Sequence, residues 1–343
     1  MAKVLYLIGA GASATVLPII DALKDETNTI IRWGLNDELR AFAKKVEIYD
    51  GFEIYSSLCT ESASFTTPDT FAKFLYCNNR DSDYIKFKTL ISVYFFWKER
   101  IEKKNEECLD KRVISFLTTL SETNGVFPKQ VKLISWNYDS QIIRAIEKAR
   151  SSSINNSFLR NFKNFPFSMD STIDKIDLSC IHLNGIAGYS YNQKTNKNEN
   201  KLNDIPSPFV FDSIANETVE EQLKIKRIFE IFSSPNENLL ISYAWEKQVS
   251  SNRDYEYSEQ RIEYAKALAR GADILVVIGY SFPFFNREID SEIFKEMPTL
   301  KKIYFQDPKL NGQFLYSQFN LSKDRIDIEH IKDVKNYYVP HEL

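Results

Sequence analysis

Val4-Leu5-Tyr6-Leu7-Ile8-Gly9-Ala10-Gly11-Ala12-Ser13 is the stretch that decides the fold of this 343-residue chain. The apolar run from Lys3 to Ile8 predicts a buried strand, and the two glycines after it predict a tight turn. We expect a helix to begin near Ser13. A glycine turn of this kind lets the backbone approach a pyrophosphate, and a following helix N-terminus offers free N–H groups. An ordinary strand-to-helix turn explains the same residues equally well.

Further strand-like runs alternate with helical patterns along the chain, which predicts an α/β fold: a Rossmann-like parallel sheet with helices on both faces. The expected strands are Val131–Ser135, Ile176–Leu183, Leu239–Tyr243, Ile274–Gly279 and Lys302–Phe305. Between residues 33 and 124 the apolar residues follow helical spacing instead, which indicates a helical insertion. The expected domains are therefore a core formed by residues 1–32 and 125–343 and an insertion at 33–124. The aromatic run Tyr94–Trp97 in the insertion is expected to pack in its core rather than to form a partner surface.

Composition excludes several classes of function. The formal net charge is −3 and the chain has no stripe of Lys and Arg, so direct nucleic-acid binding is not expected. No apolar run approaches the length of a membrane span, and we expect a cytoplasmic protein without membrane contact. Four cysteines are scattered without a Cys-x-x-Cys pair, so neither a disulfide framework nor a metal site is expected.

Polar residues follow two of the inner strands. Asn137 and Asp139 come directly after Val131–Ser135, at the end of a strand where open α/β sheets bind ligands. They are suited to holding a ribose hydroxyl or a water, although Asp139 is equally suited to cap the next helix. His182 and Asn184 lie at the end of another strand, just before a glycine. A single histidine in a strand is more often a structural residue than a catalyst.

The last motif follows the strand Ile274–Gly279. Gly279-Tyr280-Ser281-Phe282-Pro283 forms a turn before a helix that contains Asp290. Free N–H groups and the Ser281 hydroxyl at such a turn are suited to a ribose or phosphate. An ordinary strand-to-helix turn explains the residues about as well.

Taken in order, the four motifs resemble the sirtuin-like domains of prokaryotes, in particular those of antiviral defence systems. The resemblance covers residues 1–30 and 125–310. It implies NAD as substrate or ligand and the catalytic residues Asn137, His182 and Asp139, with Asn137 orienting a water and His182 acting as base. The residues that it implies as NAD contacts are Gly9, Ala10, Gly11, Ser13, Asn184, Gly279, Ser281 and Asp290. Asn184 stands where the family has a histidine before the glycine.

The branch of the family follows from what the chain lacks. Deacetylating sirtuins carry two Cys-x-x-Cys pairs, and this sequence has none. The resemblance therefore implies an NAD⁺ glycohydrolase that cleaves the nicotinamide–ribose bond and acts against phage by depleting NAD. It also implies a homo-oligomer, a partner protein such as an ATPase or sensor, or both.

Two other functions remain open. The Asn184 substitution is compatible with a sensor or scaffold that binds NAD or ADP-ribose without hydrolysing it. In the second, the insertion binds a partner protein and the nucleotide site is vestigial. A dehydrogenase is disfavoured, because no acidic residue ends a second strand about twenty residues after the glycines.

Overall fold

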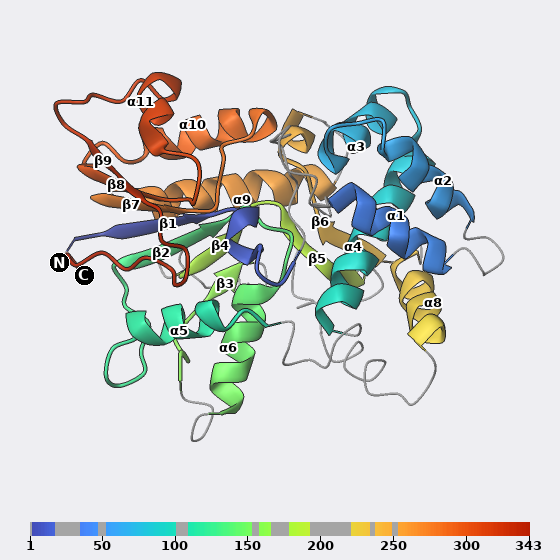
Figure 1. Ribbon diagram of the computed structural model, residues 1–343, viewed down its shortest axis with the longest axis horizontal. Coiled ribbons are helices and arrows are strands. Elements are labelled where there is room, and N and C mark those ends of the chain that lie inside the picture. Colours follow the sequence, from blue (N-terminus) through green and yellow to red (C-terminus); the bar gives the residue numbers. More distant parts are fainter. Residues whose placement is uncertain are drawn as a thin grey trace. The chain divides into compact units, whose positions relative to one another are not determined.

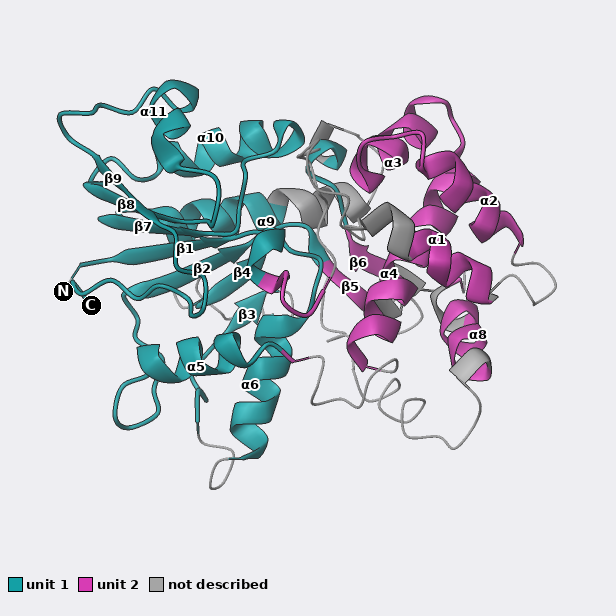
Figure 2. Ribbon diagram, viewed as in Figure 1, with its two compact units in different colours: residues 1–12, 110–185, 242–343 teal, residues 13–109, 186–241 magenta. Residues whose placement is uncertain are grey.

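The structure is a computed structural model that describes residues 2–17, 35–46, 53–100, 109–152, 158–165, 178–192, 221–233, 237–248 and 253–343. The chain forms two compact units (Figure 2). Unit 1 consists of Met1–Ala12, Asp110–Gly185 and Ser242–Leu343, and unit 2 consists of Ser13–Leu109 and Ile186–Ile241. Unit 2 thus contains most of the expected insertion together with a second segment. The expected domain boundaries at residues 32 and 124 remain a prediction.

Unit 1 contains a seven-stranded sheet in the order β3-β4-β2-β1-β7-β8-β9, and all its described pairings are parallel. The strands are β1 (Val4–Ile8), β2 (Val131–Ser135), β3 (Asn164–Phe165), β4 (Cys180–His182), β7 (Ile274–Ile278), β8 (Lys302–Gln306) and β9 (Asp327–Ile331). This sheet, with helices packed around it, confirms the predicted α/β, Rossmann-like fold.

The centre of the sheet is β1, which lies between β2 and β7. Val4 is opposite Val131 on one side and Ile274 on the other. All five β1 residues are buried. A parallel strand covered on both faces has no polar side, which explains why this run is continuously apolar instead of alternating.

Helices cover both faces of the sheet: Figure 1 shows α9 and α10 on one face and α5 and α6 on the other. The α-helices of unit 1 are α5 (Lys111–Leu120), α6 (Gln141–Ser151), α9 (Arg253–Ala269), α10 (Arg287–Lys295) and α11 (Leu315–Gln318). The short 3₁₀ segments of this unit are η1 (Ala10–Ser13), η5 (Ala244–Gln248), η6 (Phe284–Asn286) and η7 (Gly312–Phe314).

The helix expected to begin near Ser13 is not formed in the described residues that follow it. The glycine turn is itself η1, and residues 14–17 form turns in which the amides of Val16 and Leu17 both donate to Ser13 O, each at 3.0 Å. Residues 18–34 lie outside the described part of the chain. The glycines disfavour a longer α-helix here, and short 3₁₀ turns are common as connectors.

Unit 2 consists of helices and a two-stranded sheet. Its described elements are α1 (Leu35–Val46), α2 (Glu53–Ser62), α3 (Pro68–Cys77), α4 (Asp81–Arg100), β5 (Gly185–Asn192), α8 (Glu221–Phe232) and β6 (Glu237–Ile241). The expected strand at Leu239–Tyr243 is therefore β6, which pairs with β5 and not with the main sheet. The aromatic run Tyr94–Trp97 is buried on α4, as predicted, and Phe42 packs 5.0 Å from the Trp97 ring.

The described helices include none that is both long and apolar enough to cross a bilayer.

Candidate functional site

The four sequence motifs follow four neighbouring strands, β4, β2, β1 and β7. Because all four run in the same direction, the motifs meet at the carboxyl edge of the sheet. The chain leaves β1 toward the β2 side and later returns to add β7 on the opposite side of β1. Such a reversal of strand order is where open α/β sheets bind ligands.

Backbone hydrogen bonds continue beyond the strands and tie these loops together. Trp136 N donates to Ile8 O, and Leu183 N donates to Ser135 O, both at 2.8 Å. The Asn184 side chain crosses to the neighbouring loop, where its Nδ2 donates to Trp136 O at 2.9 Å. The ends of β1, β2 and β4 are thus held in fixed register.

The glycine turn packs directly against the turn after β7. A Cβ on Gly9 would lie 2.6 Å from Tyr280 Cα, and one on Gly279 would lie 2.3 Å from Ala12 N. Gly279 also has a φ of +57°, where side chains are disfavoured. Glycines are therefore needed here for contact between two backbones, whether or not a ligand binds.

Two amides of the glycine turn are used within the fold. Gly9 N donates to Ile278 O at 3.0 Å, and Gly11 N donates to Gly279 O at 2.9 Å. A pyrophosphate would need other donors in this conformation, and contact of Gly9 and Gly11 with NAD stays a prediction. Of the other residues expected there, Ala10 is exposed and Ser13 is buried.

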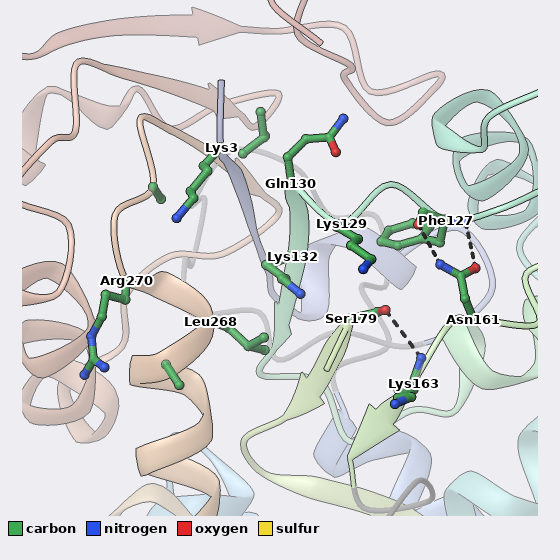
Figure 3. A pocket seen from close by; sticks show the side chains of 13 residues that line it. Lys3, Phe127, Lys129, Gln130, Lys132, Asn161, Lys163, Ser179, Leu268 and Arg270 are labelled. Atoms are coloured by element: carbon green, nitrogen blue, oxygen red, sulfur yellow. Dashed lines mark hydrogen bonds between the residues drawn. The ribbon is translucent and has the colours of Figure 1, made fainter. Parts of the chain in front are cut away.

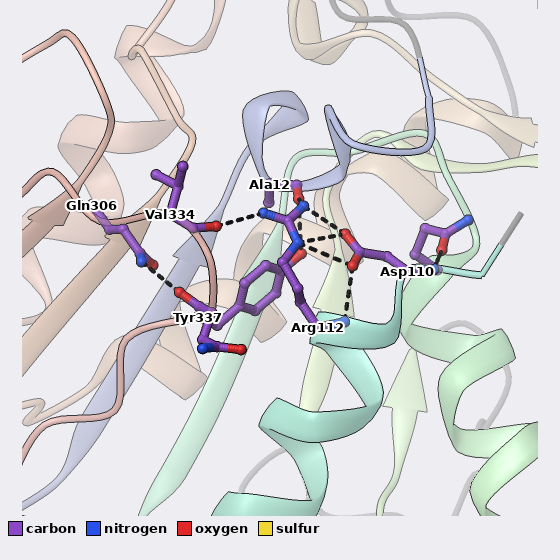
Figure 4. Close-up of polar contacts among 8 residues, drawn as sticks. Ala12, Asp110, Arg112, Gln306, Val334 and Tyr337 are labelled. Carbon is purple, nitrogen blue, oxygen red and sulfur yellow. Dashed lines mark hydrogen bonds and ion pairs between the residues drawn. The ribbon is translucent and has the colours of Figure 1, made fainter.

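The end of the same turn is held by residues that the sequence did not single out. Ala12 O accepts hydrogen bonds from Arg112 Nη2 at 2.6 Å and from Tyr337 OH at 3.1 Å (Figure 4). Arg112 also forms an ion pair with Asp110 at 2.6 Å and donates to Val334 O at 2.9 Å. Two distant parts of unit 1, at Arg112 and Tyr337, therefore fix the position of the turn.

After β2, Asn137 and Asp139 are both buried. Asn137 N donates to Ser135 Oγ at 3.2 Å, which fixes the backbone from which its side chain extends. Asp139 Oδ1 accepts from Gln141 N at 3.1 Å, at the beginning of α6. The N-cap position of α6 is Ser140 and not Asp139, so the expected cap is wrong by one residue, although the Asp139 carboxylate still accepts from the first amide of the helix. A catalytic role for Asn137 or Asp139 stays a prediction.

His182 is the last residue of β4 and is 1% exposed. Its Nε2 lies 3.4 Å from Asn164 Nδ2, and burial lowers the pKa of the imidazole to about 3. At neutral pH the ring is therefore uncharged and only weakly basic. The strand ends here, so His182 and Asn184 do not lie on one extended segment. Within the described residues, His182 Nδ1 and Asn184 Oδ1 have no hydrogen-bond partner.

Asp290 lies on α10 and links two of the loops. Its Oδ1 accepts from Trp136 Nε1 at 3.0 Å, and its Oδ2 accepts from Tyr280 OH at 2.8 Å. The Tyr280 oxygen accepts in turn from Asn286 Nδ2 at 3.0 Å. Burial raises the pKa of Asp290 from 3.8 to about 8, although both hydrogen bonds oppose the shift. With both carboxyl oxygens engaged, Asp290 supports the loops; contact with adenosine stays a prediction for it and for the exposed Ser281.

Arg261 of α9 is a second support that sequence reasoning missed. Its guanidinium donates to Leu183 O at 2.6 Å and to Ser242 Oγ. Ser242 N donates to Asn184 O at 2.9 Å, so the turn after β4 is fixed from two directions. No local pattern marks Arg261, which lies 78 residues from Leu183. Trp136 and Tyr280 also support the site and lie inside the predicted motifs. Their aromatic side chains are the sequence feature by which they could have been recognised.

Comparison with known proteins adds little to this geometry. No family model matches the sequence, and no curated protein matches it. Among solved structures, the chain is similar to that of a sirtuin, Sir2Tm, bound to a propionylated peptide. The identity is 12%, the match covers 96% of this chain and 87% of that chain, and the TM-score is 0.38. Our assignment of the fold rests on the strand order and directions.

Proposed function

We propose that the chain binds NAD at the carboxyl edge of the unit 1 sheet and hydrolyses its nicotinamide–ribose bond, as an NAD⁺ glycohydrolase. The observation that supports this proposal is the position of the four motifs. They follow four adjacent strands at the place where the strand order reverses, between β2 and β7 on the two sides of β1. The motifs come from segments up to 270 residues apart, and the sheet order brings them to one edge.

Hydrolysis breaks the bond between the ribose carbon and the nicotinamide nitrogen, and the bonding electron pair leaves with nicotinamide. A water oxygen forms the new bond to the sugar and releases a proton. Asn137 orients this water, and Asp139 supports the loop that carries Asn137. The ring of His182 is neutral and can accept only a weakly held proton, so positioning contributes more than general-base catalysis.

The test is release of nicotinamide from NAD by the purified full-length chain and by Asn137→Ala. We expect turnover to fall at least about 100-fold, as for the loss of a group that orients the reactants. The melting temperature should change little. Asn124→Ala changes an exposed asparagine that precedes β2, at the opposite edge of the sheet, and should keep full turnover. Unchanged turnover in folded Asn137→Ala would remove Asn137 from the mechanism.

A second function, binding of NAD or ADP-ribose without hydrolysis, is favoured by the buried, weakly basic His182 and by the amide side chain of Asn184. A sensor or scaffold of this kind would bind both ligands saturably in a calorimetric titration. It would release no nicotinamide at any protein concentration. Release at a rate proportional to the protein would exclude this alternative.

The biological role that we propose is antiphage defence by NAD depletion, in a homo-oligomer or with a partner protein. It is supported by the order of the four motifs alone. In infected cells, expression of the wild-type chain should lower NAD and phage yield, whereas Asn137→Ala should lower neither. Phage protection by a variant that no longer cleaves NAD would contradict this role.

A further inference from the structure

A second candidate site lies at the opposite edge of the unit 1 sheet, where the strands begin. A cavity of about 410 Å³ is enclosed by residues that precede or begin β1, β2, β4 and β7 and by the end of α9 (Figure 3). Each of these strands but β4 is five residues long, so about 16 Å of strand separates this cavity from the carboxyl edge. The cavity is therefore distinct from the site described above.

Among the residues that the structure describes, five with cationic side chains line the cavity and no Asp or Glu does. The five are Lys3, Lys129, Lys132, Lys163 and Arg270. Arg270 forms an ion pair with Glu296 at 3.1 Å, on its exposed side. Lys132 Nζ donates to Leu178 O, an uncharged acceptor, at 2.6 Å. Clustered positive charge around a hollow in a chain of net charge −3 favours an anionic ligand.

Local hydrogen bonds give the cavity a defined wall. Ser179 N donates to Lys163 O at 2.8 Å, so the backbone that carries Lys163 is fixed beside β4. Asn161 holds Phe127 through two hydrogen bonds of 2.8 Å to its backbone. Figure 3 shows Phe127, Leu268 and the lysine side chains around the same space. The lining thus combines apolar surface with several cations.

We propose that this cavity binds a small molecule that carries several phosphate groups on an apolar or aromatic body, of the kind represented by a nucleoside polyphosphate. Several cations match several phosphate charges, and Lys binds phosphate as a point charge. The apolar atoms of the lining are suited to a flat ring. A volume of about 410 Å³ holds one small molecule, as most ligand cavities do.

The experiment is a calorimetric titration of the full-length chain with ATP, inorganic tripolyphosphate and adenosine as probes. We expect saturable binding of tripolyphosphate, tighter binding of ATP because its ring reaches the apolar wall, and none of adenosine. The double variant Lys3→Gln/Lys129→Gln removes two exposed cations of the lining. It should weaken binding of ATP about tenfold or more.

Two controls make the result specific. Lys309→Gln/Lys335→Gln removes two exposed lysines that do not line the cavity, and it should leave ATP binding unchanged. Asn137→Ala should also leave it unchanged, which separates this cavity from the carboxyl edge. The proposal is overturned by any of three results: no saturation with tripolyphosphate or ATP, equal weakening in both lysine variants, or binding only of long nucleic acid.

Discussion

Asp290 is a carboxylic acid buried among aromatic side chains, with hydrogen bonds from Trp136 and Tyr280. The two rings stack 6.0 Å apart at an angle of 14°, so the acid joins the loops after β2 and β7 at one point. The two donors favour the ionised form, while burial disfavours it more strongly. The protonation of this single residue is thus coupled to the stability of the folded chain.

Because of Asp290, the stability of the folded chain should fall as the pH rises from about 4 to about 8. Its pKa in the folded state is raised to about 8, so over this range the folded chain holds a proton that the unfolded chain has lost. We expect the free energy of unfolding of the wild type, relative to Asp290→Asn, to fall by more than about 2 kcal/mol over this range. Urea unfolding at pH 5 and pH 8 measures the difference. A difference that does not vary with pH would show that the acid is ionised throughout.

His182 should give the opposite dependence on the acid side. Its pKa is lowered to about 3 in the folded chain, so between about pH 6.5 and pH 3 the unfolded chain binds the additional proton. Stability therefore falls as the pH falls through this window, and His182→Gln should remove part of this loss. Urea unfolding at pH 7 and pH 4.5 measures it. The exposed His341 provides the control, because His341→Gln should keep the wild-type dependence.

At the scale of elements, the carboxyl edge is built by the contact between two turns, η1 after β1 and the Gly279 turn after β7. Gly11 N donates to Gly279 O, so the two backbones meet directly. Arg112 and Tyr337 then hold Ala12 from the other side. The turn is rigid because separate elements fix both of its ends.

Alanine substitutions at Gly279 and Gly271 should distinguish the cost of backbone strain from the cost of a steric clash. Gly279 and Gly271 both have positive φ, at +57° and +72°, so alanine is strained at either position. A Cβ on Gly271 meets only Lys3 Nζ at 3.6 Å, whereas a Cβ on Gly279 would lie 2.3 Å from Ala12 N. We expect Gly271→Ala to cost about 1 kcal/mol and Gly279→Ala more than about 3 kcal/mol. Equal losses in chemical denaturation would mean that the two turns move apart freely.

The buried elements were predictable because their residues are continuously apolar, as in β1 and β7. β9 was missed, because Asp327–Ile331 alternates in polarity and is partly exposed at the edge of the sheet. The positions of the site motifs followed from where strands end. Their supports did not, because Arg112 and Arg261 act on residues 100 and 78 positions away and leave no local pattern.

At the scale of the whole molecule, unit 1 is assembled from three separate segments of the chain. Its central strand pairs with residues 131–135 on one side and 274–278 on the other. Pairing between strands so far apart in sequence must first close large loops, at a cost in chain entropy. Only then does burial of the strands stabilise the sheet. The sheet is therefore cooperative across almost the whole sequence.

A chain truncated after residue 272 lacks β7, β8 and β9 and leaves one side of β1 unpaired. We expect this truncation to abolish cooperative unfolding, as followed by circular dichroism in urea. Removal of residues 341–343 alone deletes the hydrogen bond from Tyr304 OH to Glu342 at 2.8 Å and a longer backbone bond of 3.3 Å from Leu343 N to Pro340 O, and should lower stability by about 1 kcal/mol. A cooperative transition in the longer truncation would show that β7 is dispensable for the sheet.

The central position of β1 also determines how long one of its edges stays unpaired during synthesis of the chain. Ile278, the partner of Ile8, is made 270 residues after it. At about 5–20 residues per second, the ribosome adds β7 between about 13 and 54 s after β1. Throughout that interval β1, whose five residues are all apolar, has an open edge, which is the state in which strands pair wrongly with other chains. β1 is thus made long before its pairing with β7 can be completed, and until then the residues on which the sheet is centred are exposed to aggregation.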